Sequence, residues 1–165
     1  MAQILDGKRV RDEILEELKP RIAQLTRKPG LAVVLVGNDP ASEVYVGSKT
    51  KTCAELGMVS EKLTPPASIS TDELLQIVAD LNARPDIDGI LVQMPLPKHI
   101  DTDAILERID PTKDADGLHP MNLGRLVLRA SGPIDSPLPC TPRGVIELVE
   151  RHGLSWDGLN VVVIG

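Results

Sequence analysis

Hydrophobic positions near the N-terminus follow a helical period. They recur three or four residues apart, at Val10, Ile14, Leu18, Ile22 and Leu25. This spacing places them on one face of a helix. Asp6 is a candidate N-cap, and the Lys-Pro-Gly break at 28–30 ends the pattern. The sequence therefore predicts an amphipathic helix that packs against the rest of the protein.

The next segment, 31–36 (LAVVLV), is an unbroken aliphatic run. Such a run is typical of a strand buried on both faces in a parallel sheet. Two further strands are predicted at 59–63 and 90–94. Three helices are predicted between and after the strands: one over 40–56 with Asp39 as its N-cap, one that starts at a capping box at Ser70, and one over 102–109. Because strands and helices alternate, we expect an α/β fold, a mostly parallel sheet with helices on both faces.

The C-terminal part of the chain is less regular. Residues 110–139 are predicted to form a loop. Thr141 and Pro142 are predicted to start a helix that runs over 143–152. The chain finishes with 161–164 (VVVI), a predicted buried strand, which meets Gly165 as the first glycine of a turn.

Composition and charge exclude several classes of protein. The 165 residues carry a net charge of −6, with acidic and basic residues intermixed. The sequence therefore has no basic stripe that could bind nucleic acid. Neither a signal peptide nor a membrane-spanning run is evident, which predicts a cytoplasmic protein with no membrane partner. Cys53 and Cys140 lack CxxC spacing and are expected to be buried thiols. His99, His119 and His152 lack metal-ligand spacing, so no metal site is expected.

Tyr45, the only tyrosine, lies four residues before Lys49 in the predicted second helix. This spacing puts both side chains on one helix face. By periodicity alone, Tyr45 fills the core and Lys49 is a solvated surface amine. The pair, however, opens a helix beyond the carboxyl end of a strand, where α/β proteins bind ligands. Short-chain dehydrogenases also use a YxxxK pair, but their cofactor-binding glycine motif precedes the pair. Here the candidate glycine turn, at Gly165, comes after it, which argues against that class.

Other polar residues follow the third predicted strand. Gln93 is the one polar residue within 90–94. A buried amide without partners costs about 1–3 kcal/mol, so Gln93 either bonds loop backbone or faces a ligand or catalytic group. Asp114 and Asp116 superficially suggest a calcium loop, but with Gly117 as its sixth residue a leucine stands where the bidentate Glu belongs. An Asx turn is expected to explain one of the two aspartates.

Five segments together resemble the bifunctional methylenetetrahydrofolate dehydrogenase/methenyltetrahydrofolate cyclohydrolase family in content, order and spacing. They are YVGSK (45–49), DGILVQMPLP (88–97), KDADG (113–117), PCTPRG (139–144) and VVVIG (161–165). The resemblance spans nearly the whole chain. It implies a role in one-carbon metabolism: NADP-dependent oxidation of 5,10-methylenetetrahydrofolate to the methenyl form, and hydrolysis of that form to 10-formyltetrahydrofolate.

The resemblance also implies roles for individual residues. Lys49 is implied to assist attack of water on the methenyl carbon, and Tyr45 to orient the folate. Gln93 is implied to hydrogen-bond Lys49, and Asp116, rather than Asp114, to bind the pterin. A cationic methenyl substrate would favour the neutral amine of Lys49, which can then accept a proton. The implied substrate-binding set is Tyr45, Lys49, Val92, Gln93, Met94, Asp116, Thr141 and Pro142.

The same resemblance divides the chain into two parts. Residues 1–139 are implied to form the folate-binding catalytic domain. Residues 140–165 are implied to be a connecting helix and the first strand of a truncated Rossmann-type NADP-binding domain, with Gly165 as its cofactor-binding residue. Dehydrogenase activity is not expected from this chain alone, and the full-length protein is implied to be a homodimer. The alternative is a folate-binding module that retains at most the cyclohydrolase activity.

Overall fold

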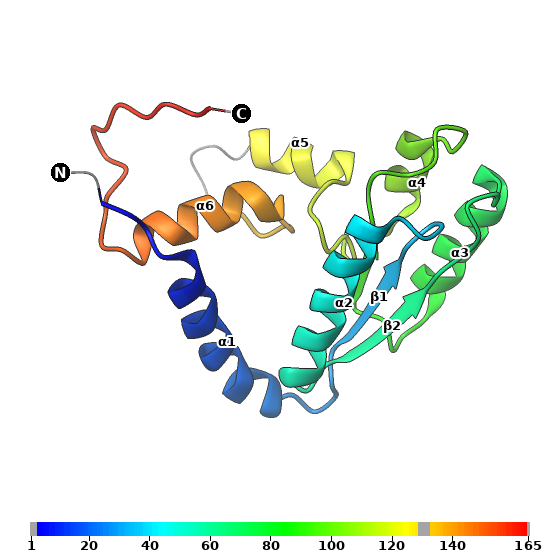
Figure 1. The fold of residues 1–165 in the computed structure, drawn as a ribbon, viewed down its shortest axis with the longest axis horizontal. Helices are drawn as coiled ribbons and strands as arrows, with labels where there is room; N and C mark the ends of the chain where they lie inside the picture. The colour runs from blue at the N-terminus through cyan, green and yellow to red at the C-terminus, as the bar shows by residue number, and fades with distance from the viewer. Residues whose placement is uncertain (1–2, 129–132, 165) are drawn as a thin grey trace.

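The computed structural model describes residues 3–128 and 133–164. Strands and helices alternate through the first two thirds of the chain, and helices alone follow (Figure 1). The elements of the described residues are α1 (Gly7–Ala23), β1 (Gly30–Val34), α2 (Pro40–Glu55), β2 (Val59–Leu63), α3 (Thr71–Ala83), β3 (Gly89–Val92), α4 (Thr102–Arg108), α5 (Pro120–Leu128) and α6 (Cys140–Glu150).

The three strands form a parallel sheet in the order β2-β1-β3. In β1, Leu31 is the register partner of Ser60 in β2 and of Gly89 in β3. The prediction of a parallel sheet is therefore confirmed. The carboxyl ends of all three strands meet at one edge, where the segment after β1 leads into α2 and the segment after β3 begins with Gln93.

Helices cover both faces of this sheet, as predicted. On one face, alternate residues of β1 and β3 pack against α3 and α4, with Leu74 and Ile105 fully buried. On the other face, Val33 and Leu91 pack against Val46 of α2. The alternation of side chains along a strand explains why neighbouring residues of one apolar run serve two separate cores.

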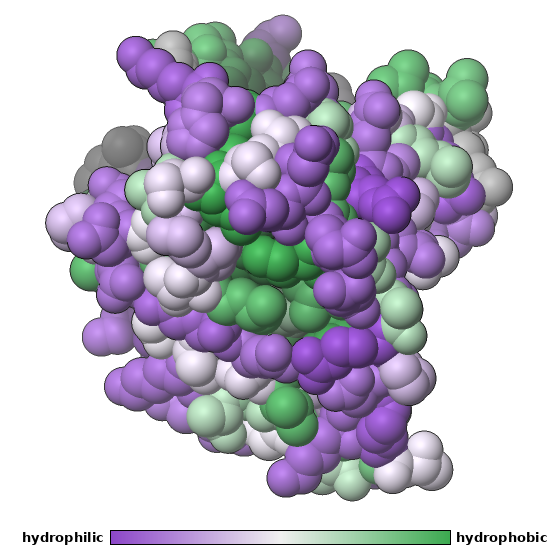
Figure 2. Space-filling view, turned by 90° about the vertical axis from the view of Figure 1, so that its right-hand side faces the viewer, coloured by the Kyte–Doolittle hydropathy of each residue, from purple (hydrophilic) through white to green (hydrophobic). Residues whose placement is uncertain are grey.

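The face on the right of Figure 1 is mostly polar, with hydrophobic residues visible in a hollow near its centre (Figure 2).

The helix caps predicted at Asp6, Asp39 and Ser70 are present. The Asp6 carboxylate accepts hydrogen bonds from the backbone N–H groups of residues 8 and 9, and Asp39 accepts one from Ser42. Ser70 and Glu73 form a complete capping box at the start of α3. The first helix, however, ends at Ala23, so Leu25 lies beyond it and is exposed.

Three expectations for the C-terminal part are corrected. The predicted loop 110–139 contains α5. The last helix starts at Cys140, after an N-cap position at Pro139 that makes no side-chain cap bond, so Thr141 does not cap it. Residues 161–164 form no strand and are exposed, because no neighbouring strand within the described residues pairs with them.

Contacts between α1 and α6 join the two ends of the chain. Arg151 donates hydrogen bonds of 2.7 and 2.8 Å to the carboxylate of Glu17, and the backbone N–H of Asp6 donates one of 3.1 Å to Nε2 of His152. Exposed ion pairs of this kind contribute little stability each, so they mainly fix the orientation of the two helices. Among the described residues, no helix is both long and apolar enough to cross a bilayer.

Candidate functional site

Lys49 and Gln93 meet at the carboxyl edge of the sheet. Lys49 lies on α2, and its Nζ donates a hydrogen bond of 3.2 Å to Oε1 of Gln93, the residue that follows β3. Nε2 of Gln93 in turn donates to the carbonyl oxygen of Met94 at 2.8 Å. This second bond fixes the amide so that its oxygen faces the lysine. The predicted bond from Gln93 to loop backbone is therefore present, and the same amide also accepts from Lys49.

The two aspartates of the 113–117 segment have different environments. Asp114 is buried, and its carboxylate accepts hydrogen bonds from the backbone N–H groups of Gly117, Leu118 and His119. It is therefore the Asx-turn residue. Asp116 is half-buried, and burial raises the pKa of its carboxyl group, an effect that the positive charge of Lys49 opposes. Asp114 thus accounts for the expected Asx turn, and the binding role expected of Asp116 stays a prediction.

Gly117 lets the Asp116 segment pack closely against the start of α6. Its φ is +68°, in the region that favours glycine, and a Cβ atom there would lie 2.2 Å from the carbonyl carbon of Leu138. As a result, a hollow of about 240 Å³ forms at this junction. Its lining residues are Asp116, Leu118, Pro139, Cys140, Thr141 and Pro142. Thr141 and Pro142, which are distant in sequence from Asp116, thus come to lie beside it.

The remaining predicted site residues are less closely grouped. Tyr45 is 66% exposed, which excludes the reading that it fills the core. Met94 is half-buried and packs against the core, whereas the side chain of Val92 is buried within it. Any contact from Val92 to a ligand must therefore come from its backbone. Gly165 lies outside the described residues.

Sequence reasoning missed Cys140 as a site residue. Its thiol was expected to be buried, but Cys140 is exposed, lines the hollow beside Asp116, and places Sγ 3.5 Å from the carbonyl oxygen of Ala115. Its position between two prolines and at the first turn of a helix was the available signal. Cys53 is buried, as expected.

The histidines bond to the backbone rather than to each other. Ring nitrogens of His99, His119 and His152 lie within hydrogen-bond distance of the carbonyl oxygens of Ile69, Glu107 and Leu148. Within residues 3–128 and 133–164, no group of three or more His, Cys, Asp or Glu side chains could hold a metal ion.

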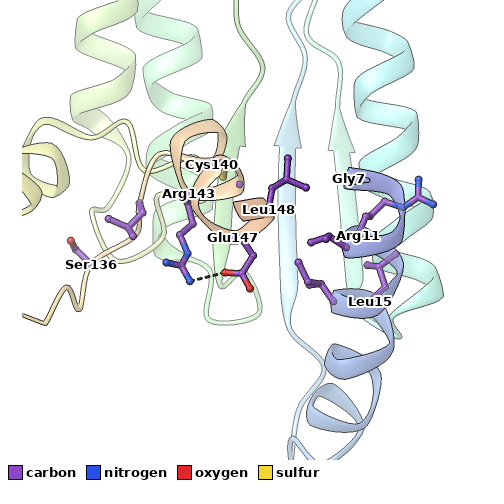
Figure 3. Close-up of a pocket in the computed structure, with 12 residues that line it drawn as sticks. Gly7, Arg11, Leu15, Ser136, Cys140, Arg143, Glu147 and Leu148 are labelled. Atoms are coloured by element: carbon purple, nitrogen blue, oxygen red, sulfur yellow. Dashed lines mark hydrogen bonds and ion pairs between the residues drawn. The ribbon is translucent and has the colours of Figure 1, made fainter. Parts of the chain in front are cut away.

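A wider apolar groove, of about 730 Å³, lies between α1 and α6 and contains none of the predicted site residues. Figure 3 shows Leu15 and Gly7 on one side of it and Leu148 and Arg143 on the other. The lining of this groove is mostly apolar. The ion pair between Arg143 and Glu147 lies within α6 and does not cross the groove to α1. The predicted polar site residues are therefore gathered at the sheet edge, not in this groove.

Comparisons with known proteins agree on one family. The model of the tetrahydrofolate dehydrogenase/cyclohydrolase catalytic domain matches residues 5–116. The bifunctional protein FolD of Solibacter usitatus is 58% identical over 168 residues, which cover 100% of this chain and 54% of that protein.

Solved structures give the same result. The bifunctional enzyme FolD of Campylobacter jejuni has a TM-score of 0.88 at 44% identity, over 92% of this chain and 54% of that one. The methylenetetrahydrofolate dehydrogenase-cyclohydrolase (FolD) of Trypanosoma brucei, complexed with NADP cofactor and inhibitor, has a TM-score of 0.88 at 36% identity, over 95% of this chain and 54% of that one. The chain thus spans about half the length of these relatives.

Proposed function

This chain belongs to the tetrahydrofolate dehydrogenase/cyclohydrolase family, and from that premise we propose that it binds folate and carries the residues for hydrolysis of 5,10-methenyltetrahydrofolate. The observation that supports this most directly is the hydrogen bond between Lys49 and Gln93, with Asp116 electrostatically coupled to the same lysine. An amine, an amide and a carboxylate thus converge from three separate segments at one edge of the sheet.

Each of these groups has a distinct task in the proposed hydrolysis. The methenyl bridge carbon is cationic, so its approach favours the neutral amine of Lys49. Water then forms a C–O bond to that carbon, and the proton that the water loses passes to the Lys49 amine. Gln93 holds the amine by its hydrogen bond and does not itself react. The tetrahedral adduct then loses its hydroxyl proton as the bond between its carbon and N5 breaks, and N5 takes up a proton. The formyl group is thereby left on N10, and the product is 10-formyltetrahydrofolate.

Asp116 and Tyr45 are proposed to bind the folate rather than to react. A carboxylate can accept paired hydrogen bonds from the N–H groups of a pterin, which fixes the ring in its plane. Tyr45 is exposed on the helix that carries Lys49, so its ring is free to pack on the ligand. Met94, Thr141, Pro142 and the backbone of Val92 complete the proposed substrate site, with 1–139 as the folate-binding part of the chain.

The dehydrogenase reaction proposed for a full-length protein uses NADP, and the segment expected to begin the NADP-binding domain has no regular structure among the described residues. Residues 161–164 are exposed and belong to no strand, and Gly165 lies outside the described residues. We therefore assign no step of the oxidation to side chains of this chain. NADP-dependent oxidation and homodimerisation belong to the proposal only for a protein that also contains the remaining length of the relatives.

Lys49→Met tests the proposed hydrolysis, because methionine keeps the length of the side chain and removes the amine. The absorbance of 5,10-methenyltetrahydrofolate reports turnover, and calorimetry with tetrahydrofolate reports binding. We expect Lys49-dependent hydrolysis to disappear, whereas Lys51→Met, an exposed site on the same helix, leaves it unchanged. Equal hydrolysis by the Lys49 variant and the unmodified chain would contradict the assignment. Binding without any Lys49-dependent hydrolysis would instead support the folate-binding module.

A further inference from the structure

We propose that Asp114 is a positioning residue that fixes the backbone of Asp116 at the edge of the sheet, a role that rests on the proposed folate site. Asp114 is 3% exposed, although it is an acidic side chain. Burial of a charged group is costly unless hydrogen bonds compensate for it. The groups that hydrogen-bond the Asp114 carboxylate therefore indicate which part of the structure it stabilises.

The partners of Asp114 lie on both sides of one turn. Oδ1 accepts from the N–H of Gly117 at 3.0 Å and of Leu118 at 3.3 Å. Oδ2 accepts from the N–H of His119 at 2.9 Å and from Nδ2 of Asn122 at 2.9 Å. One carboxylate therefore ties the turn after Asp116 to the first part of α5.

The backbone before Asp116 is fixed as well. The N–H of Ile90 in β3 donates to the carbonyl oxygen of Lys113 at 2.7 Å, and the N–H of Ala115 donates to the carbonyl oxygen of Ile90 at 3.2 Å. Asp116 thus lies between one residue bonded to the sheet, Ala115, and one bonded to the Asp114 carboxylate, Gly117. Loss of the Asp114 carboxylate would release the second attachment and leave the first.

Asp114 also acts on Asp116 through its charge. Burial is the main cause of the raised pKa of Asp116, Lys49 opposes it, and the negative charge of Asp114 adds to it. Cys140 is the other titratable group that interacts with Asp116. Removal of the Asp114 charge should therefore lower the pKa of the Asp116 carboxyl group. Loosening of the Asp116 backbone should, in addition, weaken folate binding.

Asp114→Asn tests both effects in the 165-residue chain. The variant retains the size of the side chain but removes the charge and half of the acceptor capacity. Tetrahydrofolate affinity is measured by calorimetry, and the titration of the Asp116 carboxyl carbon by ¹³C NMR. We expect at least a tenfold weaker affinity and a lower titration midpoint. Asp110→Asn is the matched control, because the Asp110 carboxylate accepts hydrogen bonds from Thr112 and not from residues 114–117. It should change neither quantity.

Each outcome decides the proposal. Unchanged affinity of the Asp114→Asn variant would overturn it, whatever the Asp116 titration shows. If the unmodified chain itself binds no folate, the proposed function fails, and the titration of Asp116 alone tests the positioning role. If Asp114→Asn does not fold, Asn122→Ala, which removes one of the four hydrogen bonds, takes its place. A severalfold weaker affinity is then expected, and wild-type affinity would overturn the proposal.

Discussion

The ammonium group of Lys49 on α2 is held 3.2 Å from the amide oxygen of Gln93, whose own nitrogen is anchored to the backbone of Met94. Gln93→Leu removes this acceptor while leaving a side chain of similar size. A hydrogen bond to a charged group contributes about 1.5–3 kcal/mol, so we expect hydrolysis of 5,10-methenyltetrahydrofolate to fall by roughly one to two orders of magnitude. Steady-state absorbance assays measure the loss.

The control for this variant is Gln76→Leu, at an exposed glutamine of α3 that bonds only Asp80. It should retain full activity. Tetrahydrofolate affinity in the Gln93 variant should fall much less than the rate, because Gln93 is proposed to act on the lysine. A rate equal to that of the Gln76 variant would show that the hydrogen bond has no part in catalysis.

Asp116→Asn should make the protein more stable at neutral pH while weakening folate binding. The pKa of Asp116 is raised by burial, so the folded state favours the protonated carboxyl. Its contribution to stability is fully present below the unfolded pKa of about 3.9 and is lost as pH rises through the folded pKa. The stability advantage of the asparagine variant should therefore be seen at pH 7 and disappear near pH 3.5. Urea unfolding at both pH values measures this.

Asp157→Asn, at an exposed position outside the site, serves as the control for replacement of a carboxylate by an amide and should bind folate normally. An asparagine variant at 116 that is less stable than the unmodified protein at pH 7 would mean that Lys49 and other contacts outweigh burial at this carboxyl group.

Gly117→Ala should disturb the site while leaving the sheet intact. The added Cβ would lie 2.2 Å from the backbone of Leu138, so the 113–117 segment and the start of α6 must separate. We expect tetrahydrofolate affinity to fall at least tenfold, with an unchanged far-ultraviolet circular dichroism spectrum. Gly47→Ala, where a Cβ would meet no atom within 4 Å, should bind normally. Normal binding by the Gly117 variant would place the ligand away from this hollow.

Ser70→Ala tests the capping box, because Ser70 accepts from the N–H of Glu73 and Glu73 accepts from the N–H of Ser70. Loss of an N-cap side chain costs about 1 kcal/mol, which corresponds to a melting temperature roughly 2–4 °C lower in a protein of this size. Ser48→Ala, an exposed position on α2, should not lower it. Calorimetry that finds both variants equal would show that α3 is held by packing alone.

The fold was predictable where local pattern and burial agree. The run at 31–36 had to be buried on both faces, and Asp39 with Pro40 marked the start of α2 unambiguously. By contrast, α5 escaped prediction because it contains Gly124, buries only Asn122, and begins after His119, whose ring nitrogen accepts from the N–H of Met121. None of these is a strong helix signal in sequence.

The site was predictable in its members but not in its geometry. Motif spacing singled out Lys49, Gln93 and Asp116, yet which of the two aspartates closes the turn depends on backbone N–H groups that only the folded turn presents. Residues 161–164 show where local composition misleads. Their β-branched side chains favour a strand, but a strand forms only when it pairs with a neighbouring strand, and none among the described residues pairs with them.

The central position of β1 has a consequence for how the protein is made. Its register partners are β2, which follows it across α2, and β3, which follows across a further helix. During synthesis β1 therefore leaves the ribosome long before Gly89 exists to pair with it, and its aliphatic residues must wait unpaired on one edge. Sheets built from such distant pairings form slowly, so the nascent chain up to α3 is the stage most exposed to aggregation and to capture by chaperones.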